Sequence, residues 1–185
     1  MSRPTIDPAE RRTRLARRHR LAPLACAAGP VEAARSMVCL HATDPATVYL
    51  SAWARTDGME IGTLERELYE ERSLVKHLAM RRTLFVFPRE LLPAVQAGAS
   101  ERVAGQERRR LVKQVEGAGL FADGEAWLAE AEAEVLGLLA DGREATSSEL
   151  REELPILEGS ITYGEGKSWG GEVPIGPQVL TVLAA

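Results

Sequence analysis

Along most of the chain, apolar residues recur every three to four positions, which is the period of an amphipathic helix. The longest stripe predicts a helix between Trp127 and Leu139 that ends near Asp141-Gly142. Alanine and leucine are abundant and aromatic residues make up only 5% of the chain, which also favours helix over sheet. The apolar positions of this stripe are Trp127, Leu128, Ala131, Val135, Leu138 and Leu139.

Proline and capping residues indicate where the earlier helices begin. Pro30 suits a first-turn position, where a missing N–H is tolerated, and the apolar stripe that follows it continues to His41. Asp44-Pro45 has the form of an N-cap followed by a first-turn proline, so the next helix is predicted to start there. Thr63 is predicted to cap a third helix. His41 is therefore predicted at the junction of two helices.

The clearest strand is Thr83–Phe87, which is rich in β-forming residues and is closed by Pro88. Helices followed by a strand within about 60 residues suit a winged-helix unit. Thr146 or Ser147 is predicted to cap a further helix, and Pro177 is predicted to open the last one. Because no strand pair is predicted after that helix, we expect the second unit to be incomplete and the chain to be a fragment or a truncated product.

Together these elements predict a mainly α fold with α+β character, built from tandem winged-helix units of which the second is incomplete. The predicted segments are a basic N-terminal arm or helix (1–23), a first winged-helix-like unit (24–98), a connecting helix (99–119) and a partial second winged-helix unit (120–185). A half-domain exposes apolar surface, so self-association through the incomplete second unit is expected.

The net charge of −4 conceals two segments of opposite sign. Residues 1–20 hold seven arginines against two acidic residues, whereas residues 120–158 hold eleven acidic residues against two arginines. The basic segment is either a solvated arm or a phosphate-binding helix, and both interpretations stay open. A second basic run, within residues 100–116, is most simply a solvated helix face. Nucleic-acid binding would therefore depend on a local basic surface rather than on the overall charge.

The spacing of reactive residues argues against several kinds of site. Cys26 and Cys39 lack a CxxC spacing, which favours two reduced thiols over a zinc site or a disulfide. The three histidines lie in no metal-binding pattern, so neither a metal nor a cofactor is expected. The run 164–168 imitates a P-loop but has Ile161 where the motif needs glycine, and a loop linking helices is expected instead. No stretch approaches the roughly 18 apolar residues of a membrane span.

The run His41-Ala42-Thr43-Asp44-Pro45 gathers an imidazole, a hydroxyl and a carboxylate within four residues. Histidine is the one side chain whose unperturbed pKa lies near neutrality, so an imidazole beside hydrogen-bonding groups can steer a water molecule. The simpler interpretation is structural: the imidazole interacts with a helix C-terminus and Asp44 caps the next helix. The residues alone leave both interpretations open.

Three stretches, at residues 31–55, 74–88 and, more weakly, 161–167, carry a resemblance to a known family. They resemble the AlkZ/YcaQ-like winged-helix DNA-binding proteins, which are bacterial DNA glycosylases that release alkylated bases and unhook interstrand crosslinks. Such proteins carry three tandem winged-helix units around a concave DNA-binding face, and this chain resembles about the first half of one.

The resemblance implies roles for individual residues. The family's catalytic Gln-x-Gln motif falls on His41 and Thr43, in a subgroup with His at the first position. His41 would orient or deprotonate a water, Thr43 would hold the same water, and Asp44 would stabilise developing positive charge. Arg81 would hold a flanking phosphate, while Arg82 stands where the family often has glycine. The DNA-binding residues expected on these grounds are Arg14, Arg17, Arg18, Arg81, Arg82, Arg108, Arg109 and Lys167.

Three functions remain open on the sequence. The resemblance implies a monofunctional DNA glycosylase for DNA repair, with alkylated double-stranded DNA as its partner, no membrane partner and a cytoplasmic, nucleoid-associated location. The alternative is a non-enzymatic winged-helix DNA-binding protein or transcriptional regulator. The acidic segment 120–158 suggests a third function, an interaction domain with no role at DNA.

Overall fold

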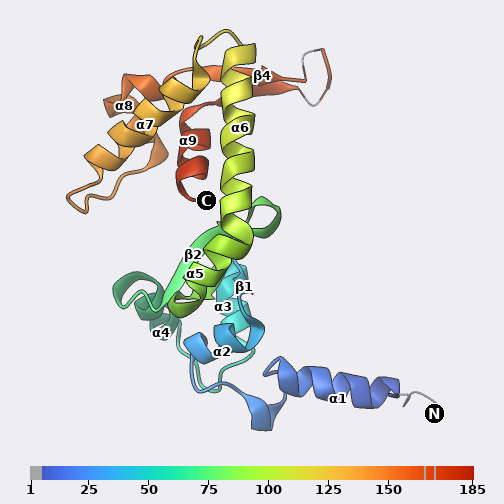
Figure 1. Ribbon diagram of the computed structural model, residues 1–185. Helices are drawn as coiled ribbons and strands as arrows, with labels where there is room; N and C mark the ends of the chain where they lie inside the picture. Colours follow the sequence, from blue (N-terminus) through green and yellow to red (C-terminus); the bar gives the residue numbers. More distant parts are fainter. Residues whose placement is uncertain (1–5, 165, 169) are drawn as a thin grey trace. The chain divides into compact units, whose positions relative to one another are not determined.

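The computed structural model describes residues 6–164, 166–168 and 170–185 (Figure 1). The chain divides into two compact units, unit 1 (Met1–Ser100) and unit 2 (Glu101–Ala185). Helix predominates in the described residues and the strands form small antiparallel sheets. This confirms the prediction of a mainly α fold with α+β character.

Unit 1 begins with helix α1 (Pro8–Arg18), which is rich in arginine. The side chain of Asp7 caps this helix by accepting hydrogen bonds from the N–H groups of Ala9 and Glu10, and none of the residues of α1 is buried. The remaining elements of unit 1 are η1 (Pro23–Ala25), α2 (Pro30–Met37), β1 (Leu40–His41), α3 (Pro45–Trp53), α4 (Ile61–Glu65), η2 (Arg66–Glu70), β2 (Leu74–Ala79), η3 (Met80–Arg82), β3 (Thr83–Pro88), η4 (Arg89–Leu91), α5 (Leu92–Val95) and η5 (Gln96–Ser100), where η marks a 3₁₀ or π turn.

In the described part of unit 1, strands β1, β2 and β3 form an antiparallel sheet in the order β1-β3-β2. In its register Leu40 lies opposite Val86, and Leu74 lies opposite Pro88. Residues that lie opposite one another share a face of a sheet, and this face is buried against α2, α3 and α4. The buried cluster there consists of Ala34, Leu40, Ala42, Val48, Ala52, Leu64, Leu68, Leu74 and Val86.

Local signals for helix starts in unit 1 are mostly confirmed. Pro30 opens α2, and Pro45 opens α3 behind the Asp44 cap. Thr63 is an exception, because it lies inside α4 and the N-cap position belongs to Glu60, which makes no side-chain capping bond. The prediction that Thr63 caps a helix is therefore wrong.

In the residues that the structure describes, unit 2 consists of four α-helices, a 3₁₀ turn and a hairpin. Its elements are α6 (Glu101–Gly117), α7 (Gly124–Leu138), α8 (Ser147–Glu153), η6 (Pro155–Leu157), β4 (Ser160–Tyr163), β5 (Gly171–Pro174) and α9 (Gly176–Leu183). Of the two caps predicted for α8, Thr146 is confirmed, and it forms a capping box: the Thr146 hydroxyl accepts from the Glu149 N–H, and the Glu149 carboxylate accepts from the Thr146 N–H. Helices α7 and α9 both pack against α6.

The hairpin β4–β5 corrects a prediction made for this segment. The glycine-rich run 164–168 was expected to link helices, but strands flank it on both sides: Ser160 pairs with Pro174 and Tyr163 pairs with Gly171. The pair precedes the last helix rather than following it. Of the P-loop-like run 164–168, Glu165 lies outside the described residues. The core beneath the hairpin includes Ile161, and in α7 the Trp127 ring stacks on Phe121 at 4.6 Å.

Candidate functional site

His41 lies in a strand and not in the last turn of a helix, which corrects the structural interpretation of the sequence. Helix α2 ends at Met37 because Val38 has a φ of 71°, a left-handed backbone that a β-branched residue rarely adopts. The chain then extends into β1, where His41 pairs with Phe85 of β3. Its exposed imidazole meets the Phe85 ring edge to face, with the centroids 5.6 Å apart and the planes at 89°.

Thr43 and Asp44 follow one residue after His41, beyond the buried Ala42, and lead from β1 to α3. The pairing with β3 continues one residue beyond β1, since the Ala42 N–H donates to the Leu84 carbonyl at 2.9 Å. Asp44 Oδ1 accepts from the Ala46 N–H at 2.8 Å, so the predicted cap of α3 is confirmed. Thr43 and Asp44 are both exposed. Three functional groups within four residues are thus held on an exposed edge by a strand pair on one side and a helix cap on the other.

The sheet brings a second imidazole into line with the first. His77 of β2 lies opposite Phe85, as does His41 of β1 from the other side. The three side chains therefore form a row across one face of the sheet, with the two histidine backbones about 10 Å apart, or two strand spacings. The His77 Nε2 and the Gln96 Oε1 are hydrogen-bonded at 3.0 Å. Sequence reasoning missed Phe85 and His77, because only the strand register shows that they accompany His41, and it missed Gln96, which only the hydrogen bond to His77 places there.

Two of the expected DNA-binding arginines lie at the tip of the β2–β3 hairpin. Arg81 and Arg82 are exposed and have φ values of 59° and 58°. The Thr83 N–H donates to the Met80 carbonyl and closes the turn. The turn ends at Thr83, two residues before Phe85, and β1 is antiparallel to β3 with His41 opposite Phe85. The arginines therefore lie at the same end of the sheet as Thr43.

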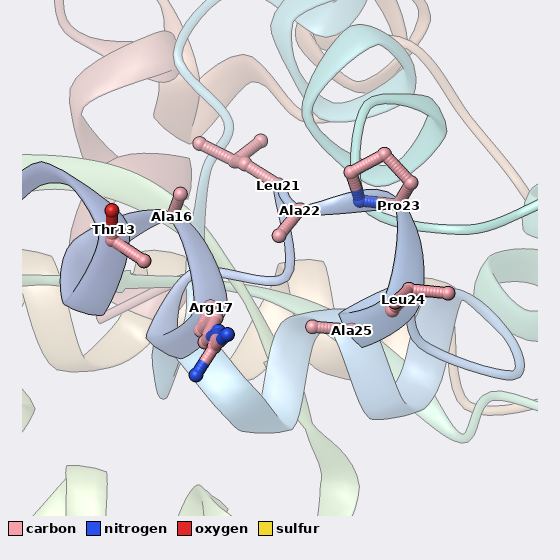
Figure 2. A pocket seen from close by; sticks show the side chains of 8 residues that line it. All are labelled: Thr13, Ala16, Arg17, Leu21, Ala22, Pro23, Leu24 and Ala25. Atoms are coloured by element: carbon pink, nitrogen blue, oxygen red, sulfur yellow. The ribbon is translucent and has the colours of Figure 1, made fainter.

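Another three of the expected arginines lie on α1, beside an apolar groove. Arg14 forms an ion pair with Glu10, while Arg17 and Arg18 are exposed. The groove has a volume of about 760 Å³, and its walls come from α1 and from the turn and η1 that follow it (Figure 2). Arg17 is the charged residue in that lining, and exposed Leu21 and Leu24 form part of the apolar wall.

The expected residues of unit 2 have different environments. Arg108 connects two helices: its guanidinium contacts Glu125 at 2.6 Å and Glu132 at 2.7 Å. The hydrogen bonds to these carboxylates raise the pKa of Arg108, with that to Glu132 dominant. Arg109, the next residue of α6, is exposed. Lys167 is exposed at the end of the β4–β5 hairpin.

Other kinds of chemistry find little support near His41. Burial raises the pKa of the Cys39 thiol, which keeps it protonated and poorly nucleophilic. Among residues 6–164, 166–168 and 170–185, no three His, Cys, Asp or Glu side chains gather as metal ligands would. No helix in the described part of the chain is long and apolar enough to cross a membrane.

Comparison with known proteins identifies the family. A family model described as DNA glycosylase AlkZ-like matches residues 34–185. The chain belongs to the AlkZ-like DNA glycosylase family. Searches of the curated proteins and of the solved structures found no match.

Membership of the AlkZ-like family places the chain among proteins of DNA repair whose partner is DNA. The match includes the whole row of His41, Phe85 and His77 and all of unit 2. It begins after α1 and η1, so the arginine-rich helix and its apolar groove lie outside the part of the chain that the family model describes.

Proposed function

We propose that this AlkZ-like protein binds double-stranded DNA and hydrolyses the N-glycosidic bond of an alkylated base at His41. The observation that carries the proposal is the exposed cluster of His41, Thr43 and Asp44, fixed between β1 and the cap of α3. An imidazole, a hydroxyl and a carboxylate held on rigid elements are suited to position one water and one developing charge. A DNA-repair function fits a location at the bacterial nucleoid.

We interpret unit 1 as a winged helix. The order α2, β1, α3, α4, β2, β3 and the sheet order β1-β3-β2 support this interpretation, with the β2–β3 hairpin as the wing. In the four-segment division proposed from the sequence, the first winged-helix-like unit spans 24–98 and follows the basic arm 1–23. The segment 99–119 corresponds to α6, which packs on α7 and α9 of the partial second unit, 120–185.

The charges of unit 1 favour DNA binding at the face of the sheet that carries His41 over DNA binding at α4, the third helix of the proposed winged helix. In a helix-turn-helix, the recognition helix enters the major groove between phosphates. Here the corresponding segment, α4 with η2, carries Glu65, Glu67 and Glu70, and its Arg66 is paired with Glu71 at 3.3 Å. These carboxylates would repel the DNA phosphates, whereas the two arginines at the tip of the β2–β3 hairpin would attract them.

The proposed phosphate contacts come from exposed cations. Arg108 is only 28% exposed and contacts two carboxylates of α7, so we assign it a structural role in joining α6 to α7. The other expected residues are chosen because they are exposed, and some of them also have an intramolecular partner, as Arg14 has in Glu10. The proposed contact set consists of Arg14, Arg17, Arg18, Arg81, Arg82, Arg109 and Lys167.

In the proposed reaction, an alkylated base leaves readily because the ring nitrogen already carries positive charge. Neutral His41 accepts a proton from a water placed about 3 Å from it, while the Thr43 hydroxyl holds the same water. The water oxygen bonds to the anomeric carbon as the bond to the base breaks. The Asp44 carboxylate, one oxygen of which caps α3, stabilises the oxocarbenium-like charge on the sugar. The Phe85 ring restricts the orientation of the His41 imidazole.

The test is base release from a duplex that contains one 7-methylguanine, with abasic sites detected by alkaline strand cleavage. Loss of a general base reduces rates about 10²- to 10⁴-fold, so His41→Ala should lower release by that order. His19→Ala is the matched control, because it removes an imidazole at the C-cap of α1. Release that survives His41→Ala unchanged would remove His41 from the mechanism.

The second candidate is a DNA-binding regulator without catalysis. The hydroxyl of Thr43 favours it, since a hydroxyl reaches less far than the glutamine amide implied by the resemblance. It predicts affinity that falls steeply with salt but no base release from any alkylated substrate. An affinity for DNA that is independent of salt would favour an interaction domain instead.

A further inference from the structure

The β2–β3 hairpin reverses through a turn that its residues do not favour. The two central residues, Arg81 and Arg82, both have positive φ, at 59° and 58°, and the Thr83 N–H donates to the Met80 carbonyl. This is the form of a type I′ turn, whose central positions are usually Asn and Gly because a Cβ is crowded there. Strain of this kind in a well-formed hairpin is a reason to look for a function of the side chains at its tip.

The side chain next to the two arginines is apolar and exposed. Met80 has 40% of its surface accessible, although it stands at the end of a strand whose neighbours Leu78 and Ala79 are buried. Its carbonyl is fixed by the turn, which places the thioether chain at the tip of the hairpin. The tip thus presents one flexible apolar side chain beside cationic ones.

The position of the tip relative to His41 follows from the strand register. Phe85, which lies opposite His41 in β3, follows Arg82 by three residues, or about 10 Å at the rise of a strand. That length corresponds to about three base-pair steps of DNA. A base whose glycosidic bond faces His41 would therefore lie a few steps from the DNA contacted by the tip.

We infer that Met80 is a wedge that enters the base stack from the minor groove while the turn arginines lie along that groove. The inference rests on the proposed DNA binding. Methionine is among the apolar side chains that proteins insert between base steps, and narrow minor grooves attract arginine. Opening the stack near the lesion brings the glycosidic bond to the His41 face without complete extrusion of the base.

The experiment uses the full chain and 7-methylguanine duplexes in which 2-aminopurine occupies, one at a time, each position within five base pairs of the lesion. Fluorescence of 2-aminopurine rises when the base is unstacked. At saturating protein, the unaltered chain should raise the signal several-fold at positions two to four steps from the lesion. Met80→Leu should keep this rise, whereas Met80→Ala and the similarly long but polar Met80→Gln should lose it.

Binding is measured on the same duplexes by fluorescence anisotropy over a range of salt concentrations. The Met80 variants should keep the salt dependence of the unaltered chain, because methionine contacts no phosphate. Leu84→Ala is the matched control, since Leu84 belongs to the same hairpin and is 36% exposed, and it should keep the 2-aminopurine rise. Circular dichroism melts check that each variant is folded.

The outcomes separate this inference from the proposed function. Salt-dependent binding without a 2-aminopurine rise at any position would overturn the wedge and leave DNA binding intact. A normal rise with Met80→Ala would do the same. Absence of salt-dependent binding by the unaltered chain would overturn both.

Discussion

Replacing Arg81-Arg82 by Asn-Gly tests whether the hairpin tip holds strain for the sake of DNA contact. A left-handed backbone costs an ordinary residue roughly 1–2 kcal/mol, whereas Asn and Gly adopt it readily. Glycine also gives the unfolded chain more conformational freedom, and this lowers the free energy of unfolding by about 0.4–1 kcal/mol. Relief at both positions, less this cost, should stabilise unit 1 by about 1–3 kcal/mol. For a unit of this size, each kcal/mol raises the melting temperature by about 4–8 °C.

The same replacement should weaken DNA binding. Each lost phosphate contact lowers the slope of log affinity against log salt by about 0.9, so losing two contacts should lower the slope by nearly 2. Calorimetric melting and anisotropy titrations measure the two effects on the same preparation. Arg81→Lys is the control, because it keeps both the charge and the left-handed backbone and should leave the melting temperature unchanged. An Asn-Gly variant that melts at or below the temperature of the unaltered chain would refute the strain argument.

Three further predictions concern unit 2. Thr146→Ala removes the capping box of α8 and should lower the free energy of unfolding by about 1 kcal/mol in urea titrations. Hydrogen bonds from the Thr146 N–H and hydroxyl hold the pKa of Glu149 below the ordinary 4.5. The stability that the ionised Glu149 carboxylate contributes is therefore present above pH 4.5 and is lost as the pH falls through the lowered pKa. Glu149→Gln should therefore flatten the decline of melting temperature in acid, and an unchanged decline would contradict this. Trp127→Phe leaves the Ile156 carbonyl without the indole N–H that lies 3.0 Å away, and chemical denaturation should show a loss of about 1–3 kcal/mol.

The helix starts were predictable because their signals are local. A cap such as Asp44 or Thr146 binds backbone groups two or three residues away, and a first-turn proline acts through its own ring. The strand at Thr83–Pro88 was equally visible, since its residues favour extended backbone wherever they lie. Thr63 failed as a cap because the N-cap position of α4 is Glu60, three residues earlier, a shift too small for local propensity to resolve.

The environment of the basic residues was not predictable from charge runs. Arg108 and Arg109 are adjacent in sequence, yet Arg108 binds two carboxylates of α7 and Arg109 is exposed. Glu132 is 24 residues from Arg108, and only the packing of α6 on α7 brings them together. The sequence alone therefore predicted DNA contact for both arginines, although one of them joins two helices and the other is exposed to solvent.

By itself, the sequence determined the mainly helical fold, the caps and prolines that start its helices, and the His41-Thr43-Asp44 run together with its family resemblance. The tertiary structure alone decided that His41 stands in a strand, because the left-handed Val38 ends α2 early and lets residue 40 pair with β3. It also decided that Phe85 and His77 join the imidazole in one row. Strand pairing joins residues more than forty positions apart, and hydrophobic periodicity within a short window carries no information about that register.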